Sequence, residues 1–235
     1  MTNSSPPDGP FGLTRDYLAG GGLAEYLKRN NPDVRLLSDE ERTANLNAIL
    51  ADRPEHGSGL WVFAYGSLIW NPAMHIAGRH LARALGWHRS FCLATKGGRG
   101  NAETPGMLLG LKQGGHCIGA ILRIAEEHIP GELEILWRRE MVADGYIPRW
   151  VEVETPDGAA LGHAIAFTIN PAGPSYCGPL PEGELVRRIA TARGPLGTAA
   201  DYLFNTRDGL RELGITDPML EALGADVENF QSTQA

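Results

Sequence analysis

Two short segments of the chain combine residue types that could hold an anion or move a proton. The first is residues 63–70, Phe-Ala-Tyr-Gly-Ser-Leu-Ile-Trp, in which an apolar run breaks at Gly66 and Ser67 and then resumes. Gly66 lets the backbone turn sharply and lets a ligand approach its amides closely. Successive amides in such a turn can bind an anion or a developing oxyanion. On these residues alone, a tight turn after a core strand is the simpler alternative.

The second segment centres on Glu140, which falls on an apolar face of a predicted helix. A helix turns about 100° per residue, so Leu133, Leu136 and Trp137 lie within about 60° of Glu140. Burial at that position raises the pKa of a carboxyl group and suits it to proton transfer near neutral pH. A buried ion pair with Arg138, Arg139 or another arginine is the structural alternative, and position alone leaves both open.

Motifs for other chemistries are missing from the sequence. The seven histidines form no HxxxH or HExxH pair and none stands beside a cysteine in ligand spacing. The run Gly97-Gly98-Arg99-Gly100 lacks the ending of a phosphate loop. Ser67 is flanked by Tyr65 and Ile69, where a nucleophile elbow needs glycine. We therefore predict no metal, no nucleotide cofactor and no serine-hydrolase triad.

The overall charge and composition favour a folded protein with a small-molecule partner. The net charge is −7, the isoelectric point is near 5.5 and 43% of the residues are hydrophobic. An acidic chain of this kind gives no electrostatic basis for binding nucleic acid or an anionic membrane. The longest nearly apolar run, residues 60–70, is about half of what a membrane span needs. Three widely spaced cysteines suit a reducing cytoplasm, which is the predicted location.

The elements that must position these segments are helices at both ends and short strands between them. Residues 16–52 have helical spacing, and Ser38 with Glu41 forms a capping-box pattern. After a break at residues 54–59, strands are predicted at 60–65, 91–96, 107–112, 117–124, 150–154 and 161–169, separated by glycine turns such as Gly97-Gly98 and Gly114-Gly115. Helices are predicted at 132–143, 182–192, 198–213 and 218–223. Strands without regular βα alternation indicate an α+β fold.

Several of these segments together resemble a known family. Residues 65–70 resemble the YGSLxW signature of the ChaC-type γ-glutamylcyclotransferases. Further matches follow in the family's order. Residues 86–91 resemble its GW.R.F segment, and Arg99-Gly100 with Pro105-Gly106 resembles its RGTP…PG loop. Arg139-Glu140 with Gly145-Tyr146 resembles its RE…GY segment, and residues 189–194 followed by Asp201-Tyr202-Leu203 resemble its final helical stretch. The resemblance covers residue 61 to about residue 223.

This resemblance implies a γ-glutamylcyclotransferase-like fold, a small mixed β-barrel with flanking helices. We assign it to residues 57–225, between an N-terminal helical extension, 1–56, and a C-terminal tail, 226–235. The family cleaves γ-glutamyl amides without a cofactor, and its ChaC branch acts on glutathione. By that analogy the α-amine of the substrate attacks its own γ-carbonyl, which forms 5-oxoproline and releases Cys-Gly.

The resemblance also implies roles for individual residues. Glu140 takes a proton from the α-ammonium group and returns one to the leaving amine. Gly66, Ser67 and Leu68 supply amides for the γ-glutamyl head or the oxyanion. The other candidate substrate-binding residues are aromatic: Tyr65, which supports the loop, and Trp70 and Tyr146, which are either pocket walls or core residues.

The sequence departs from the family pattern in one loop. Gly97-Gly98 stands where relatives often carry an acidic residue and a histidine, and Asn101-Ala102-Glu103 is inserted around the usual Thr-Pro. This departure leaves open a cyclotransferase for another γ-glutamyl amide. Two further alternatives are a non-catalytic regulator with the same fold and a structural module. The last predicts no cavity between the Gly66 turn and the Glu140 helix. The sequence predicts no oligomeric state.

Overall fold

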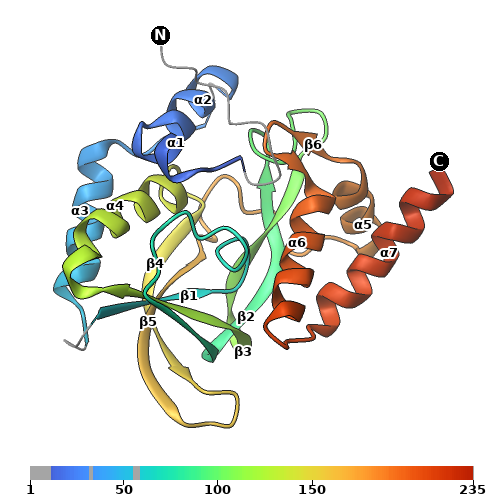
Figure 1. The fold of residues 1–235 in the computed structure, drawn as a ribbon. Coiled ribbons are helices and arrows are strands. Elements are labelled where there is room, and N and C mark those ends of the chain that lie inside the picture. The colour runs from blue at the N-terminus through green and yellow to red at the C-terminus, as the bar shows by residue number, and fades with distance from the viewer. Residues whose placement is uncertain (1–11, 32–33, 55–58, 235) are drawn as a thin grey trace.

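The computed structural model describes residues 12–31, 34–54 and 59–234, and a closed five-stranded barrel lies at its centre (Figure 1). The strand order is β1-β3-β2-β4-β5. Neighbours in this order are antiparallel, and a parallel contact of Val62 with Ile165 joins β1 to β5 and closes the barrel. The strands are β1 (Gly59–Ala64), β2 (Gly78–Thr95), β3 (Gly106–Ala125), β4 (Tyr146–Glu154) and β5 (Ala160–Ile169). The predicted α+β fold with a small mixed barrel is confirmed.

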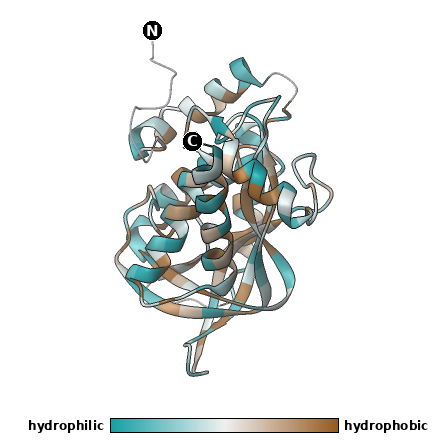
Figure 2. Ribbon diagram, turned by 90° about the vertical axis from the view of Figure 1, so that its right-hand side faces the viewer, coloured by the Kyte–Doolittle hydropathy of each residue, from teal (hydrophilic) through white to brown (hydrophobic). Residues whose placement is uncertain are grey.

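Two groups of helices flank the barrel on opposite sides (Figure 1). One group is α1 (Arg15–Ala19), α2 (Gly22–Asn30), α3 (Asp39–Ala51) and α4 (Ile129–Glu140); the other is α5 (Glu182–Thr191), α6 (Ala199–Glu212) and α7 (Pro218–Gln234). Short elements complete the chain: a 3-10 turn, Glu126–His128, and the paired strands β6 (Arg193–Gly194) and β7 (Gly197–Thr198). Figure 2 shows both hydrophilic and hydrophobic stretches on the helices, as expected when one face packs on a core.

The helix α4 is fixed against the barrel by large buried side chains. Trp137 on α4 and Phe167 on β5 meet edge to face, with ring centroids 5.2 Å apart. The indole N–H of Trp137 donates a 2.8 Å hydrogen bond to Oδ1 of Asn45 on α3. Leu133 and Leu136 are fully buried beside Trp137, so the apolar face predicted for this helix does pack into the core.

Two local predictions about helix boundaries have different outcomes. The capping box is confirmed, since Ser38 accepts from the amide of Glu41 and the Glu41 carboxylate accepts from the amide of Ser38. The helix predicted at 132–143 instead spans 129–140, because Pro130 occupies its first turn, where a missing N–H costs nothing. Glu140 is therefore the last residue of the helix. The helix predicted at 218–223 continues to Gln234.

The strand prediction was wrong at Gly114-Gly115. Residues 107–112 and 117–124 belong to one strand, β3, and its partner β2 starts at Gly78, well before the predicted residue 91. Gly114 and Gly115 have positive φ angles of 108° and 67°, and Gly86 opposite them has 76° at a break in register. At these glycines the paired strands β2 and β3 bend and continue, as strands do at bulges, and the chain does not form a reverse turn.

Two further predictions concern the start of the main domain and the absence of a membrane-spanning segment. The domain boundary predicted at residues 56 and 57 lies outside the described residues. In the part of the chain that the structure describes, no helix combines the length and hydropathy required to cross a membrane.

Candidate active site

The chain leaves β1 through a tight turn that keeps some of its amides unpaired. The amide of Ile69 donates to the carbonyl of Gly66 at 2.9 Å, and the amide of Asn71 donates to the carbonyl of Ser67 at 2.8 Å. Such a turn leaves its first N–H groups without internal acceptors. Within the described residues, the amides of Ser67 and Leu68 have no hydrogen-bond acceptor. The turn can therefore donate two hydrogen bonds to a ligand.

At position 66 a glycine is needed because a side chain would not fit there, and not because the backbone has an unusual φ angle. Its φ lies outside the left-handed region in which glycine is favoured. A Cβ atom added to Gly66 would lie 2.9 Å from the hydroxyl oxygen of Tyr202 on α6. The glycine thus lets the turn after β1 approach this hydroxyl closely, which brings two segments far apart in the sequence to one place.

Glu140 lies at the C-terminal end of α4 with only 12% of its side chain exposed. Burial raises its pKa above the usual value for glutamate, and the charge and hydrogen bond of Arg139 oppose this effect without cancelling it. The C-terminal end of a helix carries partial negative charge, which disfavours a carboxylate further. Glu140 is therefore a stronger base than an exposed glutamate.

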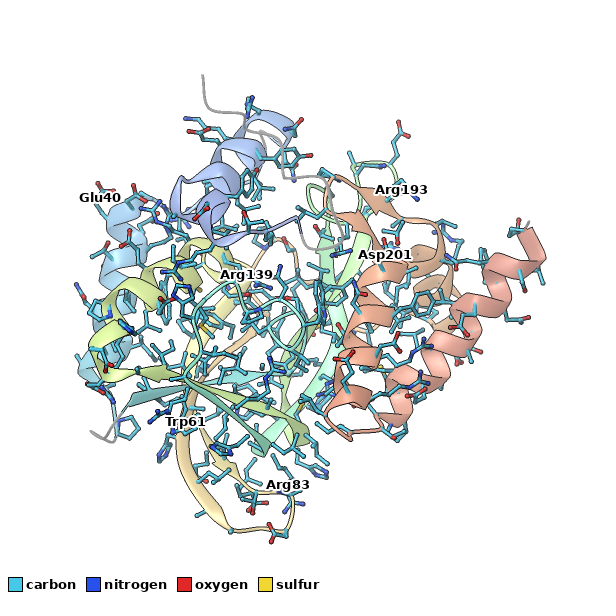
Figure 3. All side chains as sticks on the ribbon, viewed as in Figure 1. Glu40, Trp61, Arg83, Arg139, Arg193 and Asp201 are labelled. Atoms are coloured by element: carbon cyan, nitrogen blue, oxygen red, sulfur yellow. The ribbon has the colours of Figure 1, made fainter. Side chains whose placement is uncertain are left out.

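Arg139 connects this carboxylate to the turn after β1. Its Nε lies 2.8 Å from Oε1 of Glu140, and its Nη2 donates to Oγ of Ser67 at 2.8 Å. Its Nη1 donates to the carbonyl of Asn71. Arg139 lies near the middle of the molecule, whereas Glu40 and Arg193 lie on its outside (Figure 3). The buried ion pair considered from the sequence does exist, and it also aligns the carboxylate with the turn.

A small inner cavity of about 20 Å³ separates the turn from the end of α4. Its lining residues are Tyr65, Gly66, Ser67, Leu68, Leu109, Glu140, Tyr146, Phe167 and Tyr202. Of the described residues that line it, Glu140 is the single charged one. A structural module would leave no cavity at this position, so the geometry disfavours that alternative.

Three tyrosines surround the carboxylate in this cavity and remain protonated near neutral pH. Burial raises the pKa of Tyr65 and of Tyr146 well above the usual value, and raises that of Tyr202 to about 12. The negative charge of Glu140 adds to each of these shifts. The hydroxyls can therefore act as hydrogen-bond donors, while Glu140 can act as the base.

The predicted aromatic residues occupy different places around the site. The hydroxyl of Tyr65 donates to the carbonyl of Phe167 at 2.7 Å, which ties the turn to β5. The hydroxyl of Tyr146 donates to the carbonyl of Leu109 at 3.0 Å while its ring lines the inner cavity. Trp70 lies outside the inner cavity and lines a neighbouring one of about 90 Å³.

Arg99 gives this neighbouring cavity a positive charge. It is 7% exposed, and its guanidinium carbon lies 5.5 Å from the ring centroid of Trp70 and 5.8 Å from that of Tyr202. Its Nη1 donates to the carbonyl of Thr198 at 3.0 Å. No carboxylate among the described residues lies within ion-pair distance of it. A buried guanidinium held by ring faces and a carbonyl suits a carboxylate ligand.

Sequence reasoning missed Arg139 and Tyr202 as site residues. Arg139 belongs to the Arg139-Glu140 pair that carries part of the family resemblance, so the signal was present but was attributed to Glu140 alone. Tyr202 belongs to the final helical stretch of that resemblance and had no assigned role. Its approach to Gly66 depends on how α6 packs on β3 and has no local signal.

Among the residues that the structure covers, no three His, Cys, Asp or Glu side chains are grouped to hold a metal ion.

Comparison with known proteins gives consistent sequence matches. The sequence profile of the family described as ChaC-like protein matches residues 60–230. The glutathione-specific γ-glutamylcyclotransferase of Escherichia coli K12 is 40% identical over 225 residues, 93% of either chain. The γ-glutamylcyclotransferase 2-1 of Arabidopsis thaliana is 36% identical over 66% of this chain and 75% of its own.

The fold also matches a solved structure. The yeast γ-glutamyl cyclotransferase specific to glutathione, in its selenomethionine crystal form, superposes with a TM-score of 0.68 at 24% identity. The match covers 74% of this chain and 98% of the yeast chain. About a quarter of this chain thus has no counterpart in that structure.

Proposed function

Because the chain belongs to the ChaC-like protein family, we propose that it is a glutathione-specific γ-glutamylcyclotransferase. The reaction converts glutathione into 5-oxoproline and Cys-Gly. The substrate's α-amine nitrogen forms a bond to its own γ-carbonyl carbon, and the amide bond from that carbon to the cysteine nitrogen breaks. No water is consumed, and no electrons are transferred.

Glu140 acts as the general base and then as the general acid. The α-amine is protonated near neutral pH, so it must lose a proton before its lone pair can attack. Glu140 takes that proton, and the protonated carboxyl returns it to the leaving nitrogen of cysteine. The attacking nitrogen loses a second proton as the lactam forms, and the released cysteine amine takes up one proton in water to leave as an ammonium group. The carboxylate is regenerated at the end of each turnover.

The turn after β1 holds the group that reacts. The amides of Ser67 and Leu68 donate to the γ-glutamyl head or to the oxyanion that forms on the γ-carbonyl oxygen. Tyr65 and Gly66 shape the turn, and Tyr146 and Tyr202 close the cavity around it. Trp70 packs behind the turn, where its indole N–H donates to Thr206 at 3.1 Å. Holding both reacting groups of one molecule in place supplies much of the rate enhancement.

One observation carries this proposal. Among the described residues, Glu140, whose pKa burial raises, is the single charged one in a cavity that it shares with the turn bearing two amides without an acceptor. A base and oxyanion donors on either side of a small space are what an intramolecular amide displacement needs. A non-catalytic regulator has no need of a buried, destabilising carboxylate in this position.

The direct test is the release of 5-oxoproline and Cys-Gly in equal amounts from glutathione by the purified protein, followed by mass spectrometry. The rate is expected to be unchanged by a metal chelator. γ-Glutamylalanine serves as a second substrate. Cyclisation of γ-glutamylalanine without cyclisation of glutathione would support the proposed reaction but contradict glutathione as its substrate. Failure with both would contradict the proposal.

The partner in this proposal is a small molecule. The cytoplasmic location predicted from the composition and cysteine usage stays a prediction, and fractionation of the producing cells measures it.

A further inference from the structure

A second and larger cavity opens beside the inner one, and the N-terminal segment builds one of its walls. This outer cavity measures about 210 Å³, and it shares Ser67, Glu140, Tyr146 and Tyr202 with the inner cavity. The N-terminal residues that line it are Leu13, Leu23, Leu27, Asn31 and Val34. They precede residue 60, where the match to the family profile begins. We call Leu13, Leu23 and Leu27 the leucine wall.

The leucine wall is fixed on the same helix that carries Glu140. Leu18 and Leu23 are buried against Ile135 of α4. Arg15 on α1 forms an ion pair with Glu132 of α4, whose side chain is only 5% exposed. An apolar contact and a partly buried ion pair together hold α1 and α2 in one position.

The wall also contacts the turn that follows β2. A Cβ atom added to Gly97 would lie 2.7 Å from Cδ2 of Leu27 and 3.4 Å from Nδ2 of Asn31. The absence of a side chain at Gly97 thus allows α2 to close against this turn. Lys96 lines the same cavity, is exposed, and has no carboxylate within ion-pair distance among the described residues.

We propose that the leucine wall binds the leaving half of the substrate and so determines which γ-glutamyl amide is accepted. This inference rests on the proposed function. The inner cavity is too small for a tripeptide, and the leaving amine must stay near Glu140 to receive its proton. The outer cavity shares Glu140, so the leaving half extends into it.

The chemistry of this cavity matches the Cys-Gly half of glutathione. Leucine side chains suit the apolar CH₂–SH group of cysteine. The ammonium group of Lys96 suits the terminal carboxylate of glycine. A γ-glutamyl amide without a side chain or a carboxylate beyond the reacting bond would gain nothing from these contacts.

The test compares glutathione with γ-glutamylmethylamide, which lacks the leaving half's side chain and carboxylate. The half-buried residues Leu13 and Leu27 are replaced together, Leu13→Ala and Leu27→Ala, and Leu23 is kept because it is part of the core. The KM for glutathione is expected to rise about tenfold or more, with kcat within about twofold, since lost apolar contacts in a pocket have effects of this size. The kcat/KM for γ-glutamylmethylamide is expected to stay unchanged.

Matched variants separate binding from a structural effect. Tyr26→Ala changes a half-buried residue of the same helix that does not line the cavity, and it is expected to leave both substrates unaffected. Lys96→Gln is expected to raise the KM for glutathione alone. The inference would be overturned if the double variant had an unchanged KM for glutathione, or if its kcat/KM fell equally for glutathione and γ-glutamylmethylamide.

The inference can also be tested if the protein does not accept γ-glutamylmethylamide as a substrate. If the unaltered protein cyclises glutathione and not γ-glutamylmethylamide, glutathione affinity is measured by calorimetry in the Glu140→Gln background, with and without the leucine changes. An affinity that does not fall about tenfold would reject the leucine wall as a binding site. Absence of turnover with any γ-glutamyl amide contradicts the proposed function instead, so the two failures are distinguishable.

Discussion

At Glu140 two opposing effects act on one carboxylate. Burial raises its pKa, and Arg139 at 2.8 Å lowers it, with burial prevailing. A buried carboxylate near an arginine is often purely structural, and the sequence left both interpretations open. The structure combines them, because Arg139 reaches Glu140 and Ser67 with different nitrogens. The ion pair therefore positions the proposed base instead of replacing it.

The first prediction concerns the role of this carboxylate as a base. Glu140→Gln keeps the size and the hydrogen-bonding capacity of the side chain but removes the basic oxygen. We expect 5-oxoproline release to fall by about 10²- to 10⁴-fold, the usual contribution of a general base, while glutathione still binds. The control is Glu134→Gln on the same helix, where the glutamate is exposed and pairs with Arg138. Near-normal turnover in Glu140→Gln would show that another group is the base.

The second prediction concerns the pH dependence. The basic form of Glu140 exists above its pKa, so kcat/KM is expected to fall as the pH decreases through that value. Because burial raises this pKa, the fall begins at a higher pH than for an exposed glutamate. Arg139→Gln removes the group that lowers the pKa, so the acid limb of the profile is expected to move to still higher pH.

The matched control for the pH profile is Arg138→Gln. Arg138 is the neighbouring arginine and pairs with Glu134 on the outer side of the helix. This change is expected to leave the profile in place. An acid limb that stays fixed in Arg139→Gln would contradict the electrostatic role of Arg139.

At the scale of elements, the site depends on the approach of the turn after β1 to helix α6. Gly66 faces the hydroxyl of Tyr202, and Tyr202 contacts Trp70 and Phe91 edge to face, with ring centroids 6.2 Å away in both cases. The motif residues of the turn are thus held by a helix from the other end of the chain. This explains why a helix late in the sequence belongs to the site.

The third prediction tests this contact. Gly66→Ala places a Cβ atom 2.9 Å from the Tyr202 hydroxyl, and overpacking of this kind costs about 1–3 kcal/mol of unfolding free energy. Tyr202→Phe removes the oxygen that the new Cβ meets. The double variant is therefore expected to be more stable than the sum of the single changes predicts, by about 1 kcal/mol in denaturant unfolding. Strict additivity would mean that the two residues do not meet.

Helix α4 links the two halves of the site. Its middle and first turns hold the N-terminal segment through Ile135 and Glu132, and its last residues are Arg139 and Glu140. A shift of this helix would move the leucine wall and the proposed base together. The proposed selection of the leaving half and the proton transfer thus depend on one rigid element.

At the scale of the whole molecule, barrel closure places the turn and α4 on either side of one cavity. The turn begins where β1 ends, and β1 is held between β3 and β5. A Cβ atom added to Gly119 on β3 would lie 2.4 Å from the carbonyl oxygen of Ala64, the last residue of β1. The spacing of these two strands therefore depends on a glycine.

The fourth prediction tests that spacing. Gly119→Ala is expected to lower the unfolding free energy by about 2 kcal/mol or more, because the neighbouring atom is backbone and cannot move aside. That corresponds to a fall in Tm of about 4–8 °C for a chain of this size. Gly131→Ala is the control. It lies in helix α4 with nothing within 4 Å of the added atom, and stability is expected to rise by about 0.5–1 kcal/mol.

The sequence by itself determined the features that depend on neighbouring residues. The Ser38 cap, the apolar face of α4 and the turn at Gly66-Ser67 follow from local hydrogen bonding, helical periodicity and the small size of glycine. Short motifs in a fixed order were enough to indicate the family and the barrel. The strand prediction failed at Gly114, which has a positive φ angle, because a glycine in the sequence does not indicate whether the strand bends there or ends in a reverse turn.

Only the tertiary structure decided the contacts between distant segments. Arg139 reaches Ser67, Tyr202 fills the space left by Gly66, and Leu27 closes against Gly97. Each of these contacts joins elements that meet only after the barrel has closed and the helices have packed on it. The sequence named the candidate base and the turn, whereas barrel closure and helix packing set the cavity between them and the wall that the N-terminal helices add to it.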